Sequence, residues 1–203
     1  MTLHSDLRRE YLRRRIDHHG IYRVAPGAQR LLGKAPGTYY TWQFYLRRCL
    51  YDPVFVTAAA QCLVEQLPTT QVQFAGVEDA GVVLAAALGA ATGTPWLTVK
   101  KQRKVYGLHN WTEGTPTGLP IVLVDDLAGS QRSLKTAAQT CTALGLQLAD
   151  FYVTLVNKTA NGHSSSYLEN TRLISLFTCA DFAMTWQDYT AAYGQPPEFG
   201  RVC

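Results

Sequence analysis

Two adjacent carboxylates follow an apolar segment in the middle of the chain. Asp125 and Asp126 come directly after the apolar residues 121–124, and the small and polar residues 127–133 lead from them into a predicted helix. Adjacent carboxylates repel each other, so a ligand that needs them, either hydroxyl groups or a divalent cation, explains them best. Ser130, Ser133 and the amides between them would then form a helix start that binds phosphate. The alternative is a helix-capping aspartate beside a surface aspartate.

Two further segments carry groups that suit a phosphate. Residues 72–81 pass from a predicted strand into a predicted helix through Gly76 and Gly81, and such a turn exposes backbone N–H groups to phosphate oxygens, although this signal alone is weak. A basic cluster follows the next predicted strand and consists of Lys100, Lys101, Arg103 and Lys104. This cluster needs an anionic partner, and its place after a strand puts positive charge beside the other two loops.

The elements that must position these residues alternate between strand and helix. Helices are predicted over 3–16 and, after Asp52-Pro53, over 54–67. Strands are then predicted at 72–75, 96–99, 121–124, 151–156 and 173–177, with helices at 80–91 and 134–144 and a polar loop up to residue 118. This alternation predicts an α/β fold with a mostly parallel sheet, in which ligands bind at the carboxyl ends of the strands.

Composition limits the class of protein. The chain has 203 residues, of which 47% are hydrophobic and 17% charged, so it can bury a single core and is not a disordered tail protein. The longest apolar stretch, 80–91, is too short to cross a bilayer, and no signal peptide is recognised, so we expect a cytoplasmic protein without a membrane partner. The five cysteines lie far apart and lack metal-ligand spacing, so we expect reduced thiols, mostly in the core.

Positive charge is concentrated near the N-terminus. Residues 1–48 hold ten Lys or Arg against three Asp or Glu, whereas the rest of the chain holds nine against twelve. Aromatic residues interleave with these basic residues, which is one feature of a nucleic-acid surface. Arginines at this density more often form the solvated face of an amphipathic helix, so we do not expect nucleic acid as a partner.

Three motifs in a fixed order resemble the type I phosphoribosyltransferase family. Residues 121–133 resemble the family's signature for 5-phosphoribosyl 1-diphosphate (PRPP): a hydrophobic strand, two acidic residues and a small-residue phosphate loop. Residues 75–84, AGVEDAGVVL, resemble its pyrophosphate loop. Residues 100–114, KKQRKVYGLHNWTEG, are similar to the catalytic loop of the orotate phosphoribosyltransferase branch rather than of the purine enzymes. Softer similarities at 38–48 and 155–159 extend the resemblance over roughly residues 30 to 180.

The resemblance implies a type I phosphoribosyltransferase fold in one domain over 1–203. A basic helix and hood occupy 1–50, a PRPP-binding core with a mostly parallel sheet flanked by helices occupies 51–180, and a C-terminal extension occupies 181–203. The implied reaction transfers the phosphoribosyl group of PRPP to orotate and gives orotidine 5'-monophosphate and pyrophosphate. Mg²⁺ accompanies the co-substrate PRPP, and a homodimer shares its lid loop across the interface.

The resemblance also assigns roles to single residues. The catalytic residues are Lys101, Lys104, Asp125 and Asp126, because cations stabilise the departing pyrophosphate and carboxylates stabilise the oxocarbenium-like ribose. PRPP or pyrophosphate is expected to contact Glu78, Asp79, Ala80, Lys100, Tyr106, His109, Gly129, Ser130, Gln131, Arg132 and Ser133. The base is expected to contact Lys34, Tyr39, Tyr40 and Lys158. A core position is the equal alternative for the two tyrosines, and no side chain is assigned as a direct metal ligand.

Two positions depart from the family pattern. Gln131 stands where the phosphate loop has a glycine, so a positive φ there would strain Gln131 or change the loop, and Arg132 could compensate by pairing with the phosphate. Lys158 stands where the family has an arginine for the orotate carboxylate, which keeps the charge but not the bidentate geometry. Two alternatives therefore stay open: a degenerate PRPP-fold regulator that binds a nucleotide or RNA without turnover, and a phosphoribosyltransferase for another base.

Overall fold

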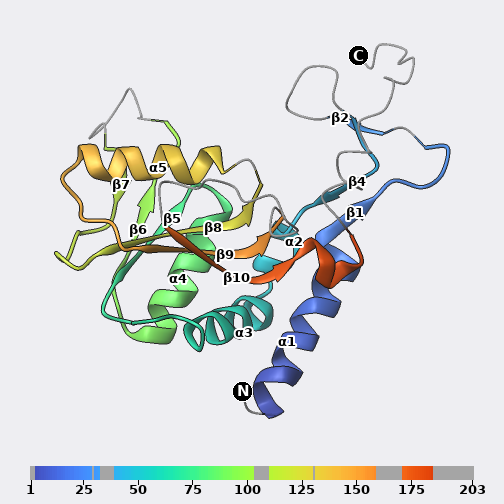
Figure 1. The fold of residues 1–203 in the computed structure, drawn as a ribbon, viewed down its shortest axis with the longest axis horizontal. Helices are drawn as coiled ribbons and strands as arrows, with labels where there is room; N and C mark the ends of the chain where they lie inside the picture. Colours follow the sequence, from blue (N-terminus) through green and yellow to red (C-terminus); the bar gives the residue numbers. More distant parts are fainter. Residues whose placement is uncertain are drawn as a thin grey trace.

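The computed structural model describes residues 3–28, 30–32, 39–102, 110–129, 131–158 and 171–184. Its main body has three layers, with a sheet between helices (Figure 1). The strands of the sheet are β5 (Gln73–Val77), β6 (Trp96–Val99), β7 (Thr112–Glu113), β8 (Ile121–Ala128), β9 (Phe151–Asn157) and β10 (Arg172–Thr178). Helices α3 (Pro53–Val64) and α4 (Ala80–Thr92) lie on one face, and α5 (Arg132–Ala143) lies on the other.

The order of the strands creates a switch point in the sheet. The order is β10-β9-β8-β5-β6-β7, and every pairing within it is parallel except that of β6 with the short β7. The chain runs outward from β5 to β6 in one direction and from β8 to β9 in the other. The helices α4 and α5 therefore lie on opposite faces, and a crevice is expected between the carboxyl ends of β5 and β8. The predicted α/β fold with a mostly parallel sheet is confirmed.

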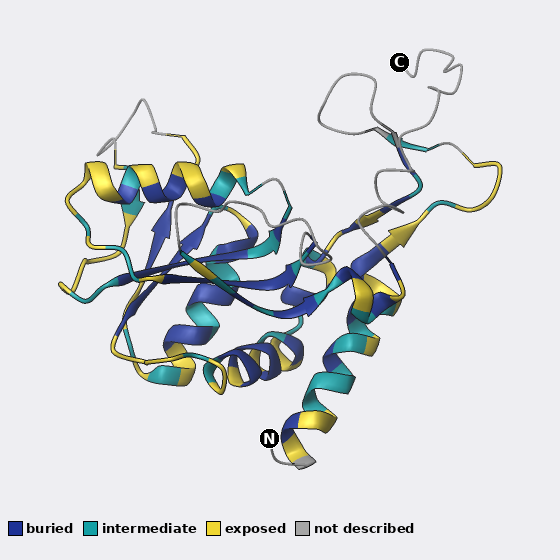
Figure 2. Ribbon diagram, in the orientation of Figure 1, coloured by how far each residue is buried: buried dark blue, intermediate teal, exposed yellow. Residues whose placement is uncertain are grey.

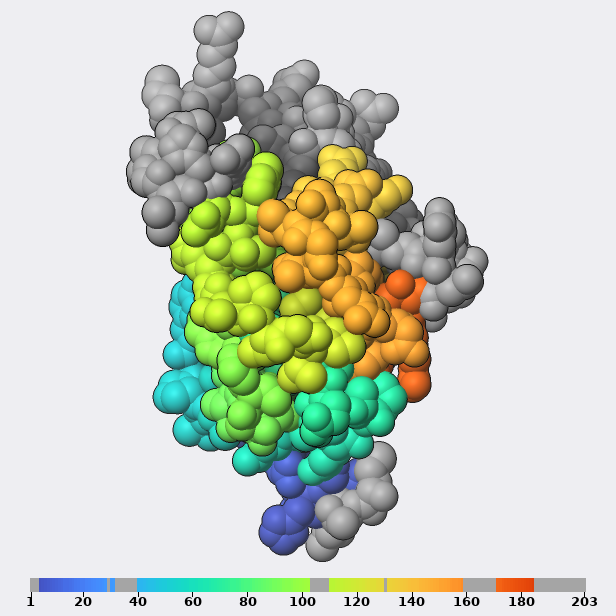
Figure 3. All heavy atoms as spheres, turned by 90° about the vertical axis from the view of Figure 1, so that its left-hand side faces the viewer, coloured from blue at the N-terminus to red at the C-terminus, as the bar shows by residue number. Residues whose placement is uncertain are grey.

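The core consists of two apolar clusters, one on each face of the sheet (Figure 2). Side chains alternate along β8, so Val122 and Val124 pack toward α3 and α4 whereas Leu123 packs toward α5. All five residues of β5 are buried because helices cover both of its faces. The sheet is therefore held rigidly from both sides, and only its edges remain for a site. Figure 3 shows the end of the core that carries the connections leading into the strands.

The N-terminal part forms a small hood, as the resemblance implied, but its short strands were not predicted from the sequence. Helix α1 (Leu3–Arg15) continues as a π-helical turn over Ile16–Gly20, and β1 (Ile21–Arg23) pairs antiparallel with β4 (Trp42–Phe44). The two-residue strands β2 (Leu31–Leu32) and β3 (Tyr39–Tyr40) pair in the same way. These strands are too short for their alternation to stand out in sequence. Helix α2 (Arg47–Leu50) then leads to α3, and the hood lies beyond the carboxyl ends of the central strands (Figure 1).

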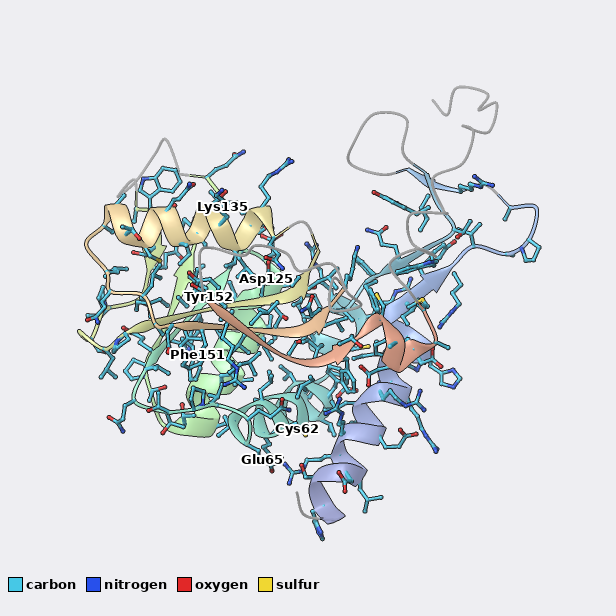
Figure 4. The ribbon with its side chains drawn as sticks, in the orientation of Figure 1. Cys62, Glu65, Asp125, Lys135, Phe151 and Tyr152 are labelled. Carbon is cyan, nitrogen blue, oxygen red and sulfur yellow. The ribbon has the colours of Figure 1, made fainter. Side chains whose placement is uncertain are left out.

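The arginines of α1 are paired within the chain rather than only solvated. Arg8 contacts Glu65 at 3.1 Å, Arg9 lies 3.6 Å from Asp181, and Arg15 contacts Asp52 at 2.8 Å. The remaining two, Arg13 and Arg14, both bind Glu10 and hold the pKa of that exposed carboxyl at about 2. Glu65, at the end of α3, faces α1 in Figure 4. The N-terminal charge therefore attaches α1 to the core, which the sequence analysis did not anticipate.

The cysteines of the described residues lie in the core, as the sequence analysis expected. Cys49, Cys62, Cys141 and Cys179 are buried free thiols, and burial raises the pKa of Cys49 and Cys141 to about 11, which makes them unreactive core residues. Cys203 lies outside the described residues. None of the helices in the described ranges is long and apolar enough to cross a membrane.

Candidate active site

The carboxyl ends of four neighbouring strands bring most of the predicted site segments to one edge of the sheet. The turn after β5 is attached to β6, since the Glu78 N–H donates to the Val99 carbonyl at 3.0 Å. The ends of β8 and β9 are joined in the same way, because the Lys158 N–H donates to the Ala128 carbonyl at 2.9 Å. This edge lies at the switch point and faces the hood (Figure 1). The acidic strand end, the glycine-bearing turn and the start of the basic segment thus meet in one place.

The acidic pair lies within a strand rather than after it. Strand β8 was predicted to end at residue 124, but pairing with β9 continues through Asp125 opposite Thr154 to Ala128 opposite Asn157. Asp125 is buried, with 9% of its surface exposed, and its Oδ1 accepts a hydrogen bond from the Asp126 N–H at 2.9 Å. Figure 4 shows Asp125 in the sheet beneath α5. The residue that caps α5 is Gln131, so the helix-capping alternative for the aspartates is wrong.

Burial and mutual repulsion disfavour charge on this pair. Burial, with a smaller contribution from Asp126, raises the pKa of Asp125 well above its ordinary value. Burial also raises the pKa of Asp126, while Arg47 and Lys101 oppose that shift. A ligand that supplies hydroxyl donors or positive charge would stabilise the charged form of both groups. Such perturbed carboxyls at the switch point of a parallel sheet are a candidate binding and catalytic centre.

The donor set at this edge fits a magnesium ion that arrives with its ligand. Mg²⁺ keeps most of its shell as water and phosphate oxygens and takes only one or two carboxylates from a protein. The described residues offer this pair and contain no group of three or more His, Cys, Asp and Glu that could hold a metal alone. Asp125 and Asp126 are a donor set of the size that Mg²⁺ takes from a protein.

Close packing fixes the glycine-bearing turn against the acidic strand. A Cβ atom on Gly81 would overlap the carbonyl oxygen of Val124, and one on Gly76 would lie 2.5 Å from the Cα of Val82. Helix α4 therefore starts in direct contact with β8, immediately before Asp125. Glu78, Asp79 and Ala80 directly precede Gly81, whose added Cβ atom would lie 3.1 Å from the Cα of Asp125. The peptide bond between Glu78 and Asp79 is cis.

The first two lysines of the basic segment differ, because Lys100 is buried and Lys101 is exposed. The Lys100 side chain is 5% exposed and pairs with Glu113 at 2.5 Å. The backbone N–H of Lys100 donates to the Trp111 carbonyl at 2.9 Å. Lys101 is exposed, and its N–H donates to Glu78 Oε2 at 3.3 Å. The structure thus places Lys101 by the acidic pair and uses Lys100 to hold the base of the loop. Arg103, Lys104, Tyr106 and His109 lie outside the described residues.

The phosphate loop has the backbone that a glycine normally provides. Gln131 has φ 55° and ψ 12°, in the left-handed region, so the condition that the sequence analysis stated for this position is met. Its carbonyl accepts the first hydrogen bond of α5 from the Lys135 N–H at 3.0 Å. The helix begins at Arg132, two residues earlier than predicted, and leaves the first-turn amides available to an anion. Arg132 is exposed and Ser133 half-buried there, Gly129 precedes the loop, and Ser130 lies outside the described residues.

Lys158 lies against this loop. It is 6% exposed, and its Nζ would be 3.7 Å from a Cβ atom placed on Gly129. Burial lowers the pKa of Lys158 to about 8. The Lys158 ammonium is therefore held close to the residue that follows β8.

The predicted base contacts are the least complete part of the site. Tyr40, in β3, is 8% exposed and belongs to the apolar core, which favours the core alternative over stacking on a base. Tyr39 lies in the same strand, but its side chain is outside what the structure describes, as is all of Lys34. The base-binding roles of Lys34, Tyr39 and Lys158 stay predictions.

Arg47 is a site residue that the sequence analysis did not assign. It begins α2, its guanidinium lies 3.4 Å from the Asp79 carboxylate, and its charge opposes the rise that burial causes in the pKa of Asp126. The available signal was its place at the end of the 38–48 segment, where an arginine pair follows the aromatic residues. The hood therefore contributes positive charge to the same edge.

A parallel sheet with an acidic pair at its switch point, a glycine-bearing turn beside it and an anion-binding helix start after it is the architecture of a type I phosphoribosyltransferase. Solved structures agree with this class. The chain matches the Mycobacterium tuberculosis H37Rv orotate phosphoribosyltransferase in complex with Fe(III) dicitrate, with a TM-score of 0.71 and 18% identity over 87% of this chain and 99% of that one. The same enzyme in complex with PRPP matches with a TM-score of 0.67 and 16% identity over 90% and 98% of the two chains.

Sequence comparison gives the family. The chain is 31% identical over 136 residues to the orotate phosphoribosyltransferase of Methanopyrus kandleri, which covers 67% of this chain and 73% of that protein. No protein-family model matches the chain. On this similarity, together with the fold, the chain belongs to the orotate phosphoribosyltransferase family.

Proposed function

We propose that this protein transfers the phosphoribosyl group of PRPP to orotate and releases pyrophosphate. The observation that carries the proposal, beyond family membership, is the pair of buried Asp125 and half-buried Asp126 at the switch point, flanked by Lys101 and a helix start suited to phosphate. The M. tuberculosis relative of the same fold has been solved with PRPP bound.

The charges at the site match those that develop when the bond between ribose C1 and pyrophosphate breaks. Negative charge grows on the pyrophosphate and positive charge on the ribose ring. Lys101, and Lys104 from outside the described residues, would stabilise the first, while Asp125 and Asp126 would accept the ribose hydroxyls and stabilise the second. The start of α5 would hold the 5-phosphate, so that the ribose is fixed at both ends.

Three finer features belong to the same proposal. Mg²⁺ would bind with PRPP beside Asp125 and Asp126 and would neutralise the diphosphate. A homodimer would place the lid loop of one protomer over the site of the other. The reaction would take place in the cytoplasm.

The test is the loss of orotate absorbance when the purified protein is mixed with PRPP and Mg²⁺. We expect orotate consumption that needs both PRPP and Mg²⁺, with none for uracil or purine bases. Consumption of another base would transfer the proposal to that base. No consumption of any base, together with measurable PRPP binding, would support the regulator without turnover. Sedimentation analysis at several protein concentrations checks the dimer.

A further inference from the structure

The hydroxyl group of Thr154 is buried in the middle of the sheet without a hydrogen bond. Thr154 lies in β9, its exposed fraction is 0%, and its Oγ1 has no hydrogen-bond partner in the described part of the chain. A buried hydroxyl without a partner destabilises a fold, whereas a valine has nearly the same shape and no polar atom. The same strand has valine at Val153 and Val156. The threonine therefore costs stability, which a role in the function would explain.

The register of the sheet places Thr154 beside the acidic pair. Thr154 is paired directly with Asp125, and the preceding pair in the ladder is Val153 with Val124. Val124 and Val153 both belong to the apolar cluster on the side of α3 and α4. Because side chains alternate along each strand, Thr154 and Asp125 both face α5, and Figure 4 shows Asp125 beneath that helix. Neighbouring strands lie about 4.8 Å apart, so the two side chains are within reach of each other.

The Asp125 carboxylate can accept such a donor. Its Oδ1 accepts the Asp126 N–H at 2.9 Å, and a carboxylate has sites for about four hydrogen bonds. A carboxylate buried to this degree is stable in its charged form only when it is paired or hydrogen-bonded. A ligand that holds Asp125 in the charged form would therefore favour a hydrogen bond from Thr154, because donors bind a charged oxygen more strongly than a neutral one.

We infer that Thr154 is a positioning residue whose hydroxyl donates a hydrogen bond to the Asp125 carboxylate when PRPP is bound. The inference rests on the proposed function, because it takes Asp125 as a group that holds the ribose hydroxyls of PRPP. Thr154 acts through Asp125 and has no contact with the reacting atoms. The ribose hydroxyls are held before the reaction as well as during it, so Thr154 contributes mainly to the affinity for PRPP.

Three substitutions separate the hydroxyl from the shape of the side chain. Thr154→Val removes the hydroxyl and keeps the branched shape, whereas Thr154→Ser keeps the hydroxyl and removes the methyl group. Thr98→Val is the matched control, because Thr98 is a buried threonine of β6 in the same sheet. Its neighbours Leu97 and Val99 pack toward α5, so Thr98 faces the opposite side from Asp125.

PRPP binding is measured by calorimetry with Mg²⁺, and the KM values for PRPP and orotate are measured together with kcat. Thermal melting of the ligand-free proteins gives their stability. Thr154→Val is also combined with Asp125→Asn, because a double-mutant cycle measures the interaction between the two side chains.

We expect Thr154→Val to bind PRPP about tenfold more weakly, the usual size for a hydrogen bond to a charged group. The KM for PRPP should rise by a similar factor, with kcat and the KM for orotate nearly unchanged. The ligand-free variant should melt about 2–4 °C higher, because the unpaired hydroxyl is gone. Thr154→Ser should retain most of the PRPP affinity although it loses a buried methyl group. Thr98→Val should bind PRPP as the unmodified protein does.

In the Asp125→Asn background, Thr154→Val should weaken PRPP binding far less, because the charged acceptor is already absent. The same tenfold loss in both backgrounds would overturn the inference. An equal loss in Thr154→Val and Thr154→Ser would also overturn it, since packing rather than the hydroxyl would then be responsible.

The inference and the proposed function can fail separately. Equal PRPP affinity of the unmodified protein and Thr154→Val, alongside normal orotate turnover, would overturn the inference and leave the proposed function intact. PRPP affinity that depends on the hydroxyl, without turnover of any base, would keep the inference and reject the proposed function. If the unmodified protein binds no PRPP, both are wrong.

Discussion

The arginine-rich helix and the sheet edge both concentrate charge, but they treat it in opposite ways. On α1, half-exposed arginines meet Glu10, Glu65, Asp52 and Asp181, and the pKa of Glu10 falls because its charged form is favoured. At the sheet edge, burial raises the pKa values of Asp125 and Asp126, so the charged forms of these carboxyls are disfavoured. Charge that the chain satisfies internally is structural, whereas buried charge that the fold disfavours indicates a ligand. The number of charged residues alone would have indicated α1, rather than the sheet edge, as the ligand site.

Removal of the lysine expected to act only in the transition state should give the largest effect. Lys104→Ala should lower kcat about 10²–10³-fold, the usual loss for one group that stabilises developing charge. Circular dichroism and thermal melting should be unchanged. Lys135→Ala, at an exposed position on α5, is the control and should retain full turnover. Turnover within a factor of a few of the unmodified protein would remove Lys104 from the catalytic machinery.

Neutralising the acidic pair should separate function from stability. Asp125→Asn with Asp126→Asn should weaken PRPP binding by about a hundredfold, since two charge-assisted contacts are lost. The same variant should be more stable than the unmodified protein at neutral pH.

The reason lies in the direction of the carboxyl pKa values. They are raised in the folded state, so the folded protein loses stability as pH rises from the ordinary aspartate pKa of 3.8 through the raised values. The variant with both Asp125→Asn and Asp126→Asn has no carboxyl groups at these positions, so its stability does not fall with pH in this way. Urea denaturation of the ligand-free proteins at several pH values measures the difference, and parallel curves would contradict the assigned burial penalty.

For Lys158 we also expect a gain in ligand affinity at a cost in stability, but here stability should rise rather than fall with pH. Its pKa falls to about 8 in the folded state, so the unfolded chain binds the proton more tightly, and stability should rise with pH between about 8 and 10.5. Lys158→Met should therefore gain stability at pH 7, on the order of 2–3 kcal/mol before any lost contacts are counted. Its affinity for anionic ligands should fall. A variant less stable than the unmodified protein at pH 7 would show that the contacts of the ammonium outweigh the cost of its burial.

The smallest effect is expected on α1. Arg9→Ala removes an ion pair with Asp181 and a stacking contact with Phe177, whose ring centroid is 5.3 Å from the guanidinium carbon. We expect a loss of about 0.5–1 kcal/mol of unfolding free energy, reduced by added salt, and no change in KM for PRPP. A change in KM would mean that the arginine-rich helix contributes to the site after all.

Sequence could predict the parts of the fold with a strong local pattern. The alternation of apolar strands and helices located β5 to β10 except β7, and the acidic pair and basic segment fell at the expected edge. The hood strands, β7 and the extension of β8 through Asp125 depend on pairing with distant partners, such as Thr98 with Glu113, which no local pattern records. The same applies to Arg47, whose role depends on where α2 lies. The sequence analysis could treat the positive φ at Gln131 only as a condition, because a glutamine, unlike a glycine, does not indicate a left-handed backbone.

The pairing at the base of the basic loop has a consequence for how its length can vary. Lys100 holds both the Trp111 carbonyl and Glu113, so the two ends of the intervening segment, 101–110, are joined at a fixed neck. Closure of such a segment has already been achieved by the sheet, and doubling its length would cost only about 0.6 kcal/mol. The reach of this segment can therefore be lengthened or shortened almost independently of the body that carries it, as long as the neck persists.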